Sequence, residues 1–255
     1  MSDRLESVLQ SARDALGDND WRFLCRVYRE NDRTYVDRLR AIGFEGMDRV
    51  LDAGCGFGQW SMALAELNRQ VVGSDICEQR VEWATRIAEV LDKKNVEFLP
   101  STLTELSFDD ASFDAVFCYG VLFLSDVRRA LTEFRRVLRP GGRLYVNANG
   151  IGWYVHLWMN APNQAADHDP RDTVVRAFTH TLEVRRGNAS GTGHTILTPD
   201  ELRDLLSEIG FGEIRIDAEG CLNVTSESSD PVVCRPFFRG EYQGLTGVFE
   251  ALGRR

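Results

Sequence analysis

From residue 49 onward, short apolar runs alternate with amphipathic stretches, and this pattern restricts the possible folds more than any other feature of the chain. The apolar runs are too short for helices and occur at residues 50–51, 71–73, 96–99, 115–118 and 144–146. The clearest amphipathic stretch, residues 125–138, places its apolar residues on one helical face. Strands that alternate with helices form a parallel sheet covered on both faces. We therefore predict an α/β, doubly wound, mostly parallel sheet.

The two flanks of this pattern predict further parts of the domain. Residues 1–44 carry apolar positions at helical spacing, near 3–16 and 20–42, and predict an N-terminal helical cap before a main domain over 45–255. Residues 150–197 interrupt the alternation after the fifth strand, and we expect an insertion that forms a lid over the substrate or packs as a subdomain.

A helix start follows the insertion. Thr198 is the expected N-cap, Pro199 the first helical residue and Glu201 the third, which is the arrangement of a capping box. Residues 211–217 and 247–252 then predict the last two strands.

Charge and cysteine usage exclude some classes of partner. The formal net charge of −9 repels polyanions, so we expect no nucleic-acid partner. The six cysteines include no C-x-x-C pair, and a chain of 255 residues is too long for a disulfide-stapled miniprotein, so reduced thiols are expected. No signal peptide and no bilayer-length apolar segment is visible, which predicts a soluble, cytoplasmic protein without a membrane partner.

A glycine-rich turn lies where the first strand must turn into a helix. Residues 52–58 read Asp-Ala-Gly-Cys-Gly-Phe-Gly, and glycines there permit positive φ and a close approach of a ligand to the backbone. Asp75 ends the next apolar run, 21 residues after Gly54, near the spacing of about 20 at which a carboxylate reaches the ribose of an adenosine. The two features together predict a nucleotide-like cofactor.

Further segments distinguish between cofactors. The glycines follow G-x-G-x-G after the acidic Asp52, whereas dinucleotide-binding dehydrogenases use G-x-G-x-x-G. With Asp75 and the segments 108–116 and 136–144, residues 45–150 resemble the class I (Rossmann-like) S-adenosylmethionine-dependent methyltransferases. This resemblance implies a seven-stranded sheet, S-adenosyl-L-methionine as the cofactor and methyl transfer as the reaction.

The resemblance also implies positions for the cofactor. Gly54, Gly56 and Gly58 would pass beneath its methionine part, and Asp52 would either lie near the ammonium group or brace the turn. Asp75 would hold the ribose hydroxyls.

Residues after the next strands would complete the cofactor site. Ile76 would lie against the adenine, and Leu103 would offer its backbone N–H to the ring. Thr102 stands where the family commonly has an aspartate that accepts from the adenine amino group, and a hydroxyl accepts more weakly than a carboxylate. Tyr119 would lie near the sulfonium or pack in the core, and Trp60 is expected to pack.

Methyl transfer from a sulfonium is an in-line displacement, so alignment and exclusion of water are the main tasks of such an enzyme. Residues 118–121 contain neither an Asn/Asp-Pro-Pro-Tyr motif nor a Pro-Cys pair, which disfavours methylation of amide-like or base amino groups and covalent cytosine chemistry. A general base is needed only when the acceptor must lose a proton.

All four histidines lie in the insertion. His156 follows the fifth strand and is the preferred catalytic base, with His180 and His194 in reserve and His168 in a solvated turn. The alternative is that a polar surface insertion simply collects histidines. Carboxylates and histidines do not recur at ligand spacing, so no metal site is predicted.

Aromatic side chains accompany these histidines. Trp153, Tyr154, Trp158 and Phe178 would form a lid over an apolar or ring-shaped acceptor, or would pack as the core of a subdomain. The predicted function is methyl transfer to a small molecule, such as a hydroxyl of a sugar or natural product. A protein side-chain methyltransferase and a non-catalytic S-adenosylmethionine-binding module are the alternatives, and the acceptor and oligomeric state stay open.

Overall fold

The computed structural model describes residues 3–29, 33–162, 164, 168–188, 193–225, 232 and 234–255. Its strands are β1 (Arg49–Ala53), β2 (Gln70–Asp75), β3 (Val96–Pro100), β4 (Phe113–Cys118), β5 (Leu138–Asn149), β6 (Gly212–Ala218), β7 (Glu241–Tyr242), β8 (Leu245–Thr246) and β9 (Val248–Arg254). Its helices are α1 (Asp3–Ser11), α2 (Asp18–Arg29), α3 (Thr34–Ala41), α4 (Gln59–Leu67), α5 (Glu78–Val90), η1 (Leu122–Leu124), α6 (Val127–Val137), α7 (Ile151–Asn160), α8 (Pro170–Arg185) and α9 (Pro199–Ile209).

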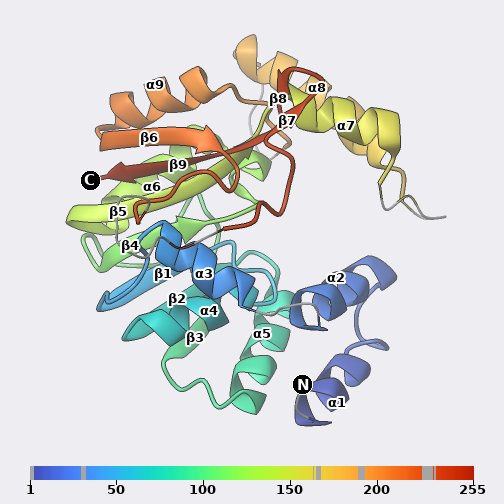
Figure 1. Ribbon diagram of the computed structural model, residues 1–255, viewed down its shortest axis with the longest axis vertical. Coiled ribbons are helices and arrows are strands. Elements are labelled where there is room, and N and C mark those ends of the chain that lie inside the picture. Colours follow the sequence, from blue (N-terminus) through green and yellow to red (C-terminus); the bar gives the residue numbers. More distant parts are fainter. Residues whose placement is uncertain are drawn as a thin grey trace.

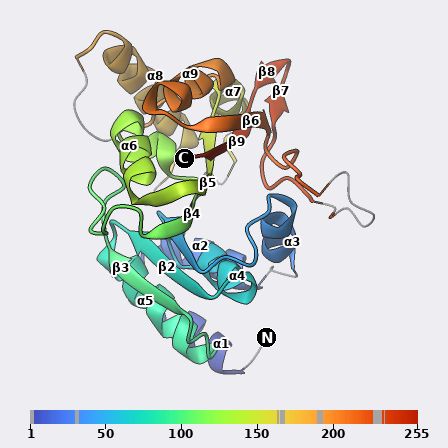
Figure 2. The same cartoon turned by 90° about the vertical axis from the view of Figure 1, so that its left-hand side faces the viewer.

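One seven-stranded sheet forms the centre of the molecule, in the order β3-β2-β1-β4-β5-β9-β6 (Figure 1). The strands from β3 to β5 are parallel, and β9 runs antiparallel between β5 and β6. Helices cover both faces, with α6 and α3 on opposite sides of the sheet (Figure 2). The predicted doubly wound, mostly parallel sheet is confirmed.

The apolar runs fill two layers of core. One layer packs α6 and α9 against the sheet, and the other packs α3, α4 and α5 against its opposite face. Because both faces of the central strands are covered, β1 and β4 are buried along nearly their whole length, although they contain Asp52 and Asp114.

The stretches with helical spacing of apolar residues contain helices in the structure. The described part of 20–42 contains α2, which ends at Arg29, and α3, which begins at Thr34. The stretch 125–138 gives α6, whose N-cap Asp126 accepts a hydrogen bond from the backbone N–H of Arg129. Residues 139–142, which follow α6, lie inside β5. There the N–H of Gly141 donates to the carbonyl of Arg255 and so links the beginning of β5 to the residue after β9.

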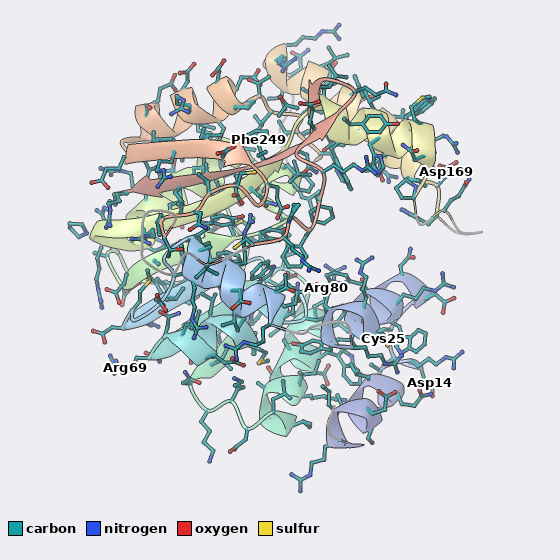
Figure 3. The ribbon with its side chains drawn as sticks, in the orientation of Figure 1. Asp14, Cys25, Arg69, Arg80, Asp169 and Phe249 are labelled. Atoms are coloured by element: carbon teal, nitrogen blue, oxygen red, sulfur yellow. The ribbon has the colours of Figure 1, made fainter. Side chains whose placement is uncertain are left out.

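The N-terminal helices pack beside α5. Leu9 of α1 and Leu24 of α2 share a buried cluster with Trp83 and Ile87 of α5. Arg80 of α5, labelled in Figure 3, forms an ion pair with Asp20 of α2 at 2.7 Å. A helical N-terminal segment is therefore attached to the main domain; its role as a cap remains a prediction.

Two helices, α7 and α8, occupy the interruption after β5 and pack against each other at one end of the sheet (Figure 1). Their shared core contains Tyr154, Leu157, Val174 and Ala177. The capping box that ends this region is confirmed: the N–H of Glu201 donates to Thr198 Oγ1 at 3.1 Å, and the N–H of Thr198 donates to Glu201 Oε2 at 2.8 Å. A lid function for residues 150–197 remains a prediction.

Candidate functional site

The glycine turn connects β1 to α4 and has three residues in the left-handed region, with φ of 79° at Gly54, 55° at Gly56 and 81° at Gly58. A Cβ at Gly54 would lie 2.2 Å from a methyl of Val121. A Cβ at Gly56 would meet only an edge of Phe23, at 4.0 Å. The backbone at Gly56 is therefore open to a close neighbour that is not part of this chain.

Helix α2 lies over this turn. The Tyr28 hydroxyl donates to the carbonyl of Phe57 at 2.7 Å, and the rings of Phe23 and Phe57 are 6.0 Å apart. The guanidinium of Arg80 lies over the Phe57 ring at 5.7 Å. The N-terminal helices therefore contact the same loop that the sequence identifies as the cofactor loop.

Asp75 is buried at the C-terminal end of β2, directly beside the turn. Its Oδ2 accepts from the N–H of Gly56 and its Oδ1 from the N–H of Cys77, both at 2.9 Å. An ionised carboxylate has about four acceptor positions, so these two bonds leave acceptor capacity for a ligand. The structure thus brings Gly56 and Asp75 together, although they are 19 residues apart in the chain.

Asp52 lies under the turn and is almost fully buried. Its Oδ2 accepts from Ser61 Oγ of α4 at 2.5 Å. Burial raises the pKa of Asp52 to about 7, the Ser61 hydrogen bond opposes this shift, and the charge of Asp75 adds to it. The contact with α4 corresponds to the bracing role, and the contact with an ammonium group stays a prediction.

The residues expected around an adenine follow β2 and β3, which are neighbours in the sheet. Ile76 is 70% exposed although it is apolar, so its side chain is available to cover a ring. Thr102 forms a bridge with Glu105, and its Oγ1 lies 3.5 Å from the carbonyl of Glu105. Leu103 packs partly buried against the core.

Tyr119, the residue after β4, points its hydroxyl at a carboxylate that the sequence did not indicate. It donates to Glu219 Oε1 at 2.9 Å, and burial, followed by the charge of Glu219, raises the pKa of Tyr119 well above 10. Trp60 is buried 4.9 Å from the Tyr119 ring and also contacts Phe117 at 4.9 Å, which agrees with the expected packing role.

Glu219 belongs to a buried charged cluster. Arg38 of α3 forms ion pairs with Glu219, at 3.3 Å, and with Glu250 of β9, and all three side chains are at most 1% exposed. The second oxygen of Glu219 accepts from the N–H groups of Phe237 and Phe238, at 2.9 and 3.2 Å. Sequence reasoning missed this cluster; the one local signal is Glu250, a charge within an apolar strand.

His156 lies on α7 among aromatic and polar groups. Its ring is 5.6 Å from Trp153 and 5.1 Å from Tyr242, and its Nδ1 is 3.0 Å from Nδ2 of Asn160. Burial, and then the charge of Arg239, lowers the pKa of His156 below its ordinary value of 6.5. The neutral ring therefore predominates at pH 7.

The other two candidate histidines lie together elsewhere. His180 lines a cavity of about 390 Å³ between α6, α8 and α9, with Asp126 and Asp204 in the same wall. His194 faces Phe123 and Tyr154, and burial lowers its pKa, with Arg176 and His180 adding to the shift. The structure does not bring these two histidines into contact with the aromatic and polar groups around His156.

The predicted aromatic lid is divided. Tyr154 is fully buried in the core between α7 and α8, whereas Trp158 and Phe178 are exposed on the insertion's surface. Trp153 packs against the edge of this core and also contacts Phe238 at 5.3 Å. The core-packing alternative therefore fits Tyr154, and Trp153 joins a set of aromatic residues that comes partly from the loop before β7.

The described residues hold no group of three or more side chains that could bind a metal ion. In the same part of the chain, none of the helices combines the length and the apolar character needed to cross a membrane. All six cysteines are free in this structure.

Comparisons with known proteins agree with this geometry. Residues 51–146 match the family model described as a methyltransferase domain. The demethylmenaquinone methyltransferase of Clavibacter sepedonicus is 37% identical over 118 residues, which cover 46% of this chain and 47% of that protein. The O-methyltransferase cnsE of Penicillium expansum is 28% identical over 173 residues, covering 66% of this chain and 54% of that protein. The chain thus spans about half the length of these curated relatives.

A solved structure matches over a larger share of the chain. The YcgJ protein of Bacillus subtilis aligns with a TM-score of 0.55 and 19% identity, over 88% of this chain and 99% of that one. At this identity the match concerns the fold, which the two chains share. The matched residues 51–146 contain the glycine turn, Asp75, Thr102, Leu103 and Tyr119.

Proposed function

Because residues 51–146 form a class I methyltransferase domain, for which S-adenosylmethionine is the cofactor, we propose that this chain transfers a methyl group from that cofactor to a hydroxyl of a small molecule. One observation carries the proposal. The Asp75 carboxylate is hydrogen-bonded to the N–H of Gly56, so an acidic acceptor and an open glycine backbone lie side by side where β1 and β2 end. Ligands of open α/β sheets bind at this edge.

The residues present fit the cofactor. Asp75 has acceptor capacity for two ribose hydroxyls, and the exposed Ile76 side chain offers an apolar cover for the adenine. The backbone N–H of Leu103 and the hydroxyl of Thr102 are proposed to meet the edge of the adenine. S-adenosylmethionine, when bound, supplies an activated methyl group.

The methionine part of the cofactor is proposed to run along the glycine turn. Gly54 and Gly58 hold the turn in its left-handed conformation, and Gly56 provides the open approach. Asp52 stands beneath it with a pKa near 7, so a nearby ammonium group would favour its ionised form. Tyr119 borders the same edge of the sheet from the end of β4.

Among the three candidate histidines, we propose His156 as the residue that exchanges a proton with the acceptor. Its ring lies 5.6 Å from that of Trp153, whereas His180 lines the cavity between α6, α8 and α9. Asn160 Nδ2 lies 3.0 Å from Nδ1 of His156 and also contacts the His156 carbonyl at 3.1 Å and the Tyr242 hydroxyl at 2.9 Å, so these groups surround the Nδ1 side of the ring.

A small-molecule acceptor is supported by the relatives. One matched protein is a demethylmenaquinone methyltransferase, whose name indicates a small-molecule acceptor. Another is an O-methyltransferase, whose name indicates that the methyl group is transferred to an oxygen atom. The formal charge of −9 opposes a nucleic-acid acceptor.

Label transfer tests the proposal against its alternatives. The protein is incubated with methyl-labelled S-adenosylmethionine and a cell extract, which is then separated into small-molecule and protein fractions. We expect label in the small-molecule fraction with the wild type and strongly reduced label with Asp75→Asn. Label in the protein fraction would favour a protein methyltransferase, and cofactor binding without any transfer would favour a non-catalytic module.

A further inference from the structure

A series of aromatic rings in contact with one another extends from the end of β4 to α7. The Tyr119 ring lies 6.3 Å from Phe238 at an interplanar angle of 25°, and Phe238 lies 5.3 Å from Trp153 at 73°. Tyr119 directly follows β4, Phe238 lies in the loop before β7, and Trp153 lies on α7, so the three residues are distant in the chain. We call Tyr119, Phe237, Phe238 and Trp153 the aromatic face.

The aromatic face is the open edge of a buried stack. Phe117, Tyr119 and Tyr145 are stacked with interplanar angles of at most 8°, and Phe117 and Tyr145 are fully buried. By contrast, Phe237 and Phe238 are 36% and 38% exposed. Phe237 packs against Tyr35 and Trp60, whereas Phe238 extends the stack outward and leaves part of its ring exposed, which offers a surface for a flat ligand.

A buried carboxylate holds this face in position. One carboxylate oxygen of Glu219 accepts a hydrogen bond from the Tyr119 hydroxyl, and the other accepts from the N–H groups of Phe237 and Phe238. Arg38 of α3 forms an ion pair with Glu219 and shares its charge with Glu250. Hydrogen bonds to a charged group are stronger than those between neutral groups, so the loop and the end of β4 are joined through Glu219.

We propose that the aromatic face binds the methyl acceptor and that this acceptor carries a planar aromatic ring, with Glu219 as the positioning residue. The proposal rests on the proposed methyltransferase function, which places the donor near Tyr119. A planar ring gains from offset or edge-to-face contact with Phe238 and Trp153, at centroid distances of 4.5–7 Å. His156 lies beside Trp153 and is itself in contact with Asn160, so both provide hydrogen-bonding groups for a polar substituent at the far end of the ring.

A matched pair of probes tests the ring. Binding of 2-naphthol and of its saturated counterpart, decahydro-2-naphthol, is measured by calorimetry in the presence of S-adenosylhomocysteine. We expect 2-naphthol to bind at least about fivefold more tightly, because only the planar ring stacks. Equal affinities for the two probes, or no binding of 2-naphthol, would overturn the proposal.

Substitutions locate the binding. Phe238→Ala is expected to weaken 2-naphthol binding about tenfold, whereas Val224→Ala, which alters an apolar residue of similar exposure outside the aromatic face, leaves it unchanged. Glu219→Gln keeps one carbonyl oxygen for the Phe237 and Phe238 N–H groups, so its affinity should fall between those of the wild type and Glu219→Ala. An unchanged affinity in Phe238→Ala would refute the assignment.

The failures of the two proposals are distinguishable. If the wild type binds no S-adenosylmethionine, the proposed function fails. If it binds the cofactor but does not prefer the planar probe, only the aromatic acceptor is refuted.

Discussion

Gly56→Ala tests whether the cofactor passes the glycine turn. The residue has φ of 55°, and an added Cβ would meet only the edge of Phe23, at 4.0 Å. The chain itself therefore accommodates the methyl group, and the cost to stability is that of an alanine in the left-handed region, about 1–2 kcal/mol. For a chain of this size, each 1 kcal/mol lowers Tm by about 2–4 °C.

Gly56→Ala is expected to affect the affinity for the cofactor more than the stability of the fold. If the methionine part lies against the Gly56 backbone, the new methyl group occupies its space, and we expect the affinity for S-adenosylmethionine to fall at least about tenfold, or about 1.4 kcal/mol. Calorimetric titration measures this loss, and a thermal melt measures the change in stability.

Two other glycines separate the effects. Gly187, in the turn after α8, has φ of 73° with nothing within 4 Å of an added Cβ, so Gly187→Ala has the same backbone cost and should bind the cofactor normally. Gly54→Ala would place its Cβ 2.2 Å from Val121 and should lower Tm further than either. If Gly56→Ala binds S-adenosylmethionine as tightly as Gly187→Ala does, the cofactor does not pass this turn.

Three further predictions concern ionisable groups. Asp75→Asn removes charge-assisted hydrogen bonds to the ribose and should weaken S-adenosylmethionine binding roughly 10- to 150-fold by calorimetry; wild-type affinity would exclude Asp75 from the ribose site. If Asp52, with a pKa of about 7, meets the ammonium group, binding favours its ionised form and the affinity should rise between pH 6 and pH 8; an affinity independent of pH would restrict Asp52 to bracing the turn. The lowered pKa of His156 keeps the ring neutral at pH 7, so the rate of methyl transfer should decline only as the pH falls below 6.5. In His156→Gln we expect kcat to fall about 100-fold and this decline at low pH to disappear. A decline at low pH that persists in the variant would point to another base.

Local patterns predicted much of the fold. The apolar run at residues 115–118 became part of β4, and the Thr198 and Glu201 pair formed its capping box, because such signals depend on neighbours within a few residues. The helical spacing of apolar residues within 20–42 likewise corresponds to α2 and α3.

The candidate site was predictable only in part. The glycine turn and Asp75 could be paired from sequence because the spacing between Gly54 and Asp75 is typical of a nucleotide-binding fold. The contact between Arg38 and Glu219 spans 181 positions, and Phe238 lies in a loop without periodic pattern, so no local signal indicated them. The proposed binding site for the methyl acceptor is therefore formed by residues that the fold brings together, and no sequence motif marks it.

Calorimetric titration of the wild-type protein with S-adenosylmethionine, beside an identical titration with NAD, tests the central claim most directly. Binding of S-adenosylmethionine at one site per chain, with no heat from NAD, is the predicted result. No heat with S-adenosylmethionine, or saturable binding of NAD in its place, would contradict the account.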